Sequence, residues 1–125
     1  PEGVLGISYK ENDKVIHNPN RPLIVDLDSL PFPARHLRRR EYTSPLLRGR
    51  LIDEIHTSRG CWGRCTFCCE PRMSRSRWRF RSPENIIAEM IELRDRYNVE
   101  EVALLDDHLV GNRERFMKIL DLIDP

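Results

Sequence analysis

This chain is organised around residues 57–69, TSRGCWGRCTFCC, which hold all four of its cysteines. Three of them, Cys61, Cys65 and Cys68, have the spacing C-x3-C-x2-C. Thiolates are soft ligands that suit iron–sulfur clusters or zinc, and a complete shell for a four-iron cluster takes four of them. Three thiolates leave one iron without a protein ligand. An open metal position is where a small molecule binds and reacts.

The spacing of the cysteines, with an aromatic Phe67 before the last of them, resembles the radical S-adenosylmethionine (SAM) superfamily. The resemblance implies that Cys61, Cys65 and Cys68 hold a [4Fe-4S] cluster whose fourth iron chelates SAM. It implies that an electron from the cluster splits SAM into methionine and a 5′-deoxyadenosyl radical, while the protein positions and shields these cofactors. Phe67 is implied to help hold the adenine of SAM, but its spacing fits a core residue equally well. Cys69 lies outside the motif, and we expect a loop or buried thiol there, because a fourth ligand would close the reactive position.

Composition and charge set broader limits on the partners of the chain. Its 21 basic and 20 acidic side chains give a formal charge of +1, which makes nucleic acid or a membrane surface an unlikely main partner. No apolar run is long enough to span a bilayer, and no signal peptide opens the chain. Cysteines clustered in one motif favour a reducing, cytoplasmic location. The chain begins at proline and ends after a helical pattern, so we interpret it as an excised part of a longer protein.

The residues around the cysteine motif predict two strand–helix units. Residues 51–57 fit a strand, and Ser82 fits the N-cap of a helix that ends near Asn98. Residues 102–105 are continuously apolar, as in a strand buried on both faces, and Asn112 fits the cap of a second helix. This order predicts an α/β fold with a parallel sheet, namely the first two βα units of a partial (β/α) barrel.

Acidic residues follow the second predicted strand. Ligands of parallel sheets bind beyond the carboxyl ends of the strands, so the cysteine loop and Asp106-Asp107 should lie side by side. In the resembling family, residues at this strand end contact the amino group of SAM, and a carboxylate suits that ammonium. Asp106 and Asp107 are therefore candidate SAM ligands, unless one of them caps the following turn. The same segment matches D-x-H-x-x-G, a cobalt-binding pattern of some cobalamin domains, but its place after a core strand argues against His108 as a ligand.

The N-terminal part of the chain predicts a β-hairpin over residues 3–17 and a proline-broken linker. This segment, above all DLDSLPFPAR at residues 26–35, resembles the connector between the cobalamin domain and the core of cobalamin-binding radical SAM proteins. We therefore divide the chain into a connector, 1–47, and the N-terminal part of a radical SAM core, 48–125. No chemistry is predicted before about residue 48. The segment 70–81 is basic, and its alternation SRWRFR at residues 76–81 is interpreted as extended with one solvated face.

The resemblance implies that the parent is an iron–sulfur oxidoreductase that acts as a cobalamin-dependent methyltransferase or cyclase. Its substrate is unknown, and its electrons are expected from a flavodoxin or ferredoxin. Two alternatives stay open, a tRNA methylthiotransferase-like enzyme and a small zinc or iron–sulfur module without SAM chemistry. Two βα units leave an open sheet edge, so we expect the chain to self-associate and to be inactive by itself.

Overall fold

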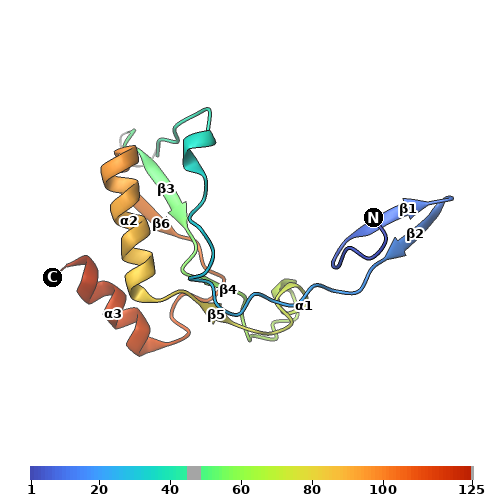
Figure 1. Cartoon of the computed structure of the whole chain (residues 1–125). Coiled ribbons are helices and arrows are strands. Elements are labelled where there is room, and N and C mark those ends of the chain that lie inside the picture. Colours follow the sequence, from blue (N-terminus) through green and yellow to red (C-terminus); the bar gives the residue numbers. More distant parts are fainter. Residues whose placement is uncertain (45–48, 125) are drawn as a thin grey trace.

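The computed structural model describes residues 1–44 and 49–124 and contains a parallel pair of strands joined through a helix (Figure 1). Strand β3 (Ile52–Ile55) pairs in parallel with β6 (Glu101–Leu104), with Ile52 opposite Glu101 and Ile55 opposite Leu104. Helix α2 (Pro83–Tyr97) lies between them in sequence, and α3 (Arg113–Ile123) follows β6 and packs against α2. The α/β organisation and the parallel pairing are as predicted, whereas the remainder of a barrel stays a prediction.

The helices begin and end at the predicted caps. The Ser82 hydroxyl accepts a hydrogen bond from the Asn85 amide at 3.1 Å, and the Asn112 side chain accepts one from the Arg115 amide at 2.8 Å. Both bonds satisfy amides that have no partner within the helix. Asn98 ends α2 in the left-handed conformation with φ 53°. Asparagine tolerates that conformation better than most residues do, which explains why the helix stops there.

The core lies where the strand pair meets the two helices. Its fully buried members are Ile55 of β3, Ile86 and Leu93 of α2, and Ile119 of α3. The second strand was expected to be buried on both faces, but all four residues of β6 are only half-buried. Leu105, which follows the strand, is exposed. Among the described residues β6 has no strand on its outer edge, so self-association stays a prediction.

Three short elements separate β3 from α2. They are β4 (Ser58–Arg59), α1 (Glu70–Met73) and β5 (Arg79–Phe80). Strands β4 and β5 pair antiparallel, with Ser58 opposite Phe80 and Arg59 opposite Arg79. The cysteine segment is therefore a loop closed at its base by a two-stranded ladder.

The N-terminal hairpin consists of β1 (Ser8–Glu11) and β2 (Lys14–His17) and projects away from the strand pair (Figure 1). Asn12 and Asp13 form its turn with φ values of 46° and 60°, the backbone that a tight two-residue turn requires. A turn was expected at residues 10–13, but strand β1 extends to Glu11. The linker contains one 3-10 turn, η1 (Arg35–Leu37), and residues 42–44 run antiparallel to the start of β3. The predicted domain boundary at residues 47 and 48 lies outside the described residues.

A buried network of charges attaches the linker to the core. The Arg35 guanidinium lies 3.1 Å from the Asp53 carboxylate of β3 and 2.6 Å from the Glu89 carboxylate of α2. Arg81 also pairs with Glu89, and Arg38 pairs with Asp53 at 2.7 Å. The linker, expected to carry no chemistry, thus supplies a buried cation. The solvated face expected for residues 70–81 does not include Arg81, whose side chain is 11% exposed.

Within residues 1–44 and 49–124, none of the helices is long and apolar enough to cross a lipid bilayer.

We predict that Glu89→Gln lowers the free energy of unfolding by about 3–5 kcal/mol, since it leaves the Arg81 guanidinium without its carboxylate and leaves the buried Arg35 with Asp53 alone. Urea unfolding followed by circular dichroism measures this change. Glu92→Gln on the same helix is the matched control, because the Glu92–Arg96 pair is much more exposed and should contribute about 0.5 kcal/mol or less. Equal losses in the two variants would contradict the role given to Glu89.

Candidate metal centre and its surroundings

The carboxyl ends of β3 and β6 are tied together by Asp106. Its carboxylate accepts hydrogen bonds from the Thr57 hydroxyl at 3.0 Å and from the Ser58 hydroxyl at 2.8 Å. The Ser58 amide donates a third bond to the same carboxylate. Thr57 and Ser58 are buried and lead directly into the cysteine loop. The predicted juxtaposition of this loop with the end of the second strand is therefore present.

The structure gives Asp106 and Asp107 different surroundings, whereas the sequence made them equal candidates for binding SAM. Asp106 is half-buried and caps the turn after β3, whereas Asp107 is exposed. Asp107 lines a cavity of about 380 Å³ with residues of the cysteine loop and of the segment after it. Of the two aspartates, Asp107 is therefore the one that lines the cavity beside Gly60.

The three motif cysteines are free thiols on one loop. Cys61 is half-buried, and Cys65 and Cys68 are exposed. The Gly63 amide donates to the Cys61 sulfur at 3.2 Å and the Glu70 amide to the Cys68 sulfur at 3.4 Å. Backbone amides also donate hydrogen bonds to the sulfurs of iron–sulfur clusters.

Gly63 lies between two of the sulfurs. A Cβ added to it would lie 3.2 Å from the Cys61 sulfur and 3.8 Å from the Cys65 sulfur, so a larger side chain would fill the space they share. Within the described residues, no three His, Cys, Asp or Glu side chains are already gathered as ligands of one metal ion. The donor set nevertheless fits an iron–sulfur cluster, because three soft thiols and two amide donors lie on one accessible loop.

Gly60 fixes the start of the loop. Its φ of +88° favours glycine, and a Cβ there would collide with the Arg77 carbonyl oxygen and lie 2.6 Å from Cβ of Ser74. The backbone of the cysteine loop therefore packs directly on the segment between α1 and β5.

Phe67 and Cys69 also lie on this loop. Phe67 is 91% exposed, which excludes a core role for its ring in this structure. Cys69 is an exposed thiol just before α1, and its sulfur lies 4.0 Å from the Met73 sulfur.

Two arginines that the sequence did not single out line the same cavity as Asp107. Arg59 and Arg79 are paired residues of β4 and β5. Arg79 donates to the Ile24 carbonyl at 2.8 Å, and its buried Nε has no partner among the described residues. Burial lowers the pKa of Arg79, the Arg59 charge lowers it further, and Glu70 acts in the opposite direction. The alternation of arginine and aromatic residues before α2 was the available signal for Arg79, whereas no pattern marked Arg59.

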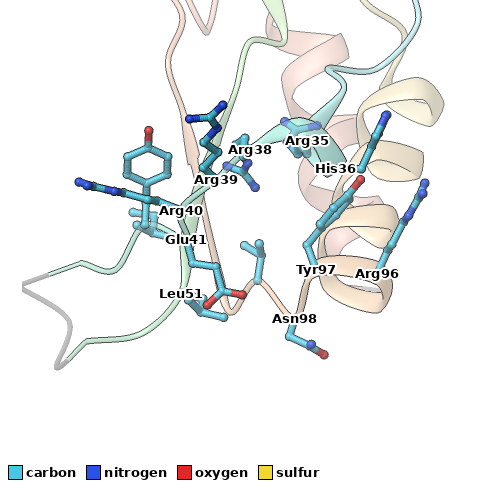
Figure 2. A pocket seen from close by; sticks show the side chains of 13 residues that line it. Arg35, His36, Arg38, Arg39, Arg40, Glu41, Leu51, Arg96, Tyr97 and Asn98 are labelled. Carbon is cyan, nitrogen blue, oxygen red and sulfur yellow. The ribbon is translucent and has the colours of Figure 1, made fainter.

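A second cavity, of about 540 Å³, lies at the opposite end of the strand pair (Figure 2). Its lining includes Leu51 and Ile52 at the start of β3, and Asn98 and Val99 between α2 and β6. Figure 2 shows Arg96 and Tyr97 of α2 on one side of it and Arg39 and Arg40 of the linker on the other. Because this cavity adjoins the amino ends of the strands, it is separate from the cysteine loop.

A three-cysteine loop at the carboxyl edge of a parallel βα sheet, with acidic residues on the neighbouring strand end, defines a class of enzymes that hold an iron–sulfur cluster with an open position. The model of the radical SAM superfamily matches residues 55–124, more than half of the chain. The chain therefore belongs to the radical SAM superfamily.

Three curated relatives match most of the chain. An uncharacterized methyltransferase of Pyrococcus horikoshii is 38% identical over 94% of this chain and 25% of its own length. The cytidylyl-2-hydroxyethylphosphonate methyltransferase of Streptomyces wedmorensis is 30% identical over 89% of this chain and 26% of its own. The anaerobic magnesium-protoporphyrin IX monomethyl ester cyclase of Synechocystis is 25% identical over 94% of this chain and 23% of its own. The chain thus spans about a quarter of these relatives. No solved structure matches it significantly.

We predict that Asp106→Ala destabilises the fold by about 1–3 kcal/mol, because it leaves the buried Thr57 and Ser58 donors without their acceptor. The exposed Asp107 provides the matched control, and Asp107→Ala should change stability by about 0.5 kcal/mol or less. Urea unfolding of the two variants beside the parent chain measures the difference. A stable Asp106→Ala variant would show that the strand ends do not depend on this carboxylate.

Proposed function

We propose that this chain is the N-terminal part of a radical SAM core in which Cys61, Cys65 and Cys68 bind a [4Fe-4S] cluster and SAM binds at its fourth iron. One observation carries the proposal: the three-cysteine loop is held against the end of β6 by the hydrogen bonds of Asp106. The cluster would supply the electron that splits SAM into methionine and a 5′-deoxyadenosyl radical. The chain's own residues bind and orient SAM.

The cavity beside Gly60 has the charges that the methionine part of SAM requires. That part carries an ammonium and a carboxylate. Asp107 provides a carboxylate for the ammonium, and Arg59 or Arg79 provides a guanidinium for the carboxylate. The unpartnered Nε of Arg79 is consistent with a further acceptor at this place. Phe67, exposed on the loop, is free to stack on the adenine.

Asp106 has a positioning role in this proposal rather than contact with SAM. The Thr57 and Ser58 hydroxyls and the Ser58 amide already donate to its carboxylate. By holding residues 57 and 58 it sets the place from which the cysteine loop begins.

Residues 1–47 act as the connector and residues 48–125 as the first two βα units of a (β/α) barrel. The printed names of the relatives, two methyltransferases and a cyclase, support a parent that carries out methyl transfer or ring closure. The resemblance of the connector supports a cobalamin domain before it. The proposed electron donor is a flavodoxin or ferredoxin, and the proposed location is the cytoplasm. His108 is not the cobalt ligand in this proposal, since its ring packs 4.6 Å from that of Trp62.

The test of the proposal is anaerobic reconstitution with iron and sulfide. The expected result is a brown protein with four irons per chain whose electron paramagnetic resonance spectrum changes when SAM is added. Cys61→Ala, Cys65→Ala and Cys68→Ala should each lose the cluster. Cys69→Ala is the matched control and should keep it. Stoichiometric zinc in a colourless protein, or loss of the cluster in Cys69→Ala, would refute the three-ligand proposal.

Asp107→Ala should weaken SAM binding roughly ten- to a hundredfold while iron content is unchanged, because a charge-assisted hydrogen bond worth about 1.5–3 kcal/mol is lost. Equilibrium binding of SAM to the cluster-loaded protein, in a chain of the relatives' full length, measures this effect. Asp121→Ala, a change at an exposed aspartate of α3, should leave the affinity as it was. SAM binding that is equally tight in Asp107→Ala and the parent would rule out Asp107 as the ammonium ligand.

A further inference from the structure

Three rings bring together two loops that lie far apart in the sequence. Trp62 of the cysteine loop meets Trp78 edge-on with ring centroids 5.1 Å apart, and it meets His108 edge-on at 4.6 Å. The Trp78 indole also donates a hydrogen bond to the His108 carbonyl at 3.0 Å. Aromatic pairs of this geometry stabilise a fold beyond the contribution of the area that they bury. The contacts therefore restrict an otherwise exposed loop.

Gly111 provides the space in which the rings meet. A Cβ at this position would lie 2.8 Å from Trp78 and 2.9 Å from both His108 and Trp62. Its backbone is not in the left-handed region, so the rings rather than the φ angle exclude a side chain there. The D-x-H-x-x-G pattern thus has a physical reason in this fold that involves no cobalt, since His108 supplies a ring and Gly111 makes room for it.

Arg115 anchors the ring cluster to the end of β3. Its guanidinium lies 5.8 Å from the Trp78 ring centre and 5.2 Å from that of Phe80. It donates to the carbonyls of Thr57 at 2.7 Å and Arg81 at 2.9 Å. Burial lowers the pKa of Arg115, while the nearby Asp106 carboxylate acts in the opposite direction. The rings are thereby fixed to the turn that Asp106 caps.

We propose that Trp62, Trp78 and His108 form an aromatic clamp that positions the cysteine loop relative to the end of β6. Trp62 follows the first cysteine directly, and His108 follows Asp107 directly. The clamp thus joins Trp62, which follows the first proposed cluster ligand, to His108, which follows the aspartate proposed to bind the SAM ammonium. Its consequence for SAM rests on the proposed function. These three are positioning residues, because they act through their neighbours.

The clamp itself is tested without any cofactor, by hydrogen exchange of the purified chain. Trp62→Ala should speed exchange of the Gly63 amide, which donates to the Cys61 sulfur, and of the amides of residues 108–111, by about two- to tenfold. Exchange in α2 should be unchanged. No acceleration in these two loops, or acceleration spread equally over α2, would overturn the proposal.

The effect on the site is tested on cluster-loaded protein of the relatives' full length at equal iron content. Trp62→Ala and Gly111→Ala should both bind SAM about tenfold or more weakly. Trp62→Phe, which keeps a ring, should restore most of the affinity. The control is Val110→Ala, a change at an exposed residue of the same loop.

Affinities equal to the parent in both variants would overturn the positioning role. Loss of iron from both would also overturn it, since the rings would then serve cluster assembly or folding. If the parent protein itself binds no cluster or SAM, the proposed function fails, while hydrogen exchange still decides whether the clamp exists.

Discussion

The carboxylate of Glu89 is the constraint on which this structure depends most. It is 1% exposed on α2 and is neutralised from two sides, by Arg35 of the linker and by Arg81 after β5. A buried carboxylate without partners would cost several kcal/mol, so these segments must meet at one place. Asp53 of β3 extends the network, because it binds Arg35 and Arg38. The linker is consequently part of the folded core.

Asp106 provides a second tie, closer to the chemistry. It joins the carboxyl end of β6 to the turn after β3, from which the cysteine loop departs. The candidate centre is therefore built on two adjacent strand ends, as is usual for ligand sites of parallel sheets. The short β4–β5 ladder and the packing of Gly60 close the base of this loop. The loop that carries the proposed cysteine ligands is thus fixed at its base by other parts of the fold.

Membership of the radical SAM superfamily accounts for this arrangement, but the chain spans only about a quarter of its curated relatives. This chain contains the cysteine loop, which follows β3, and one neighbouring strand, β6. In the proposed function, this part holds the cluster and one side of SAM. A shared quarter of the sequence is compatible with relatives named as methyltransferases and as a cyclase, because one fold can support different reactions.

Sequence alone determined the local features of this protein. The cysteine spacing, the caps at Ser82, Asn98 and Asn112, the hairpin and the two strand–helix units depend on neighbours within a few residues, where spacing and residue type carry the information. Tertiary structure decided the pairings over long distances. The Arg35–Glu89 ion pair, the division of labour between Asp106 and Asp107, and the contact of Trp62 with His108 each join residues far apart in the chain. No pattern in one segment states which distant side chain it will meet, because that depends on how strands and helices pack to bury apolar area and neutralise charge.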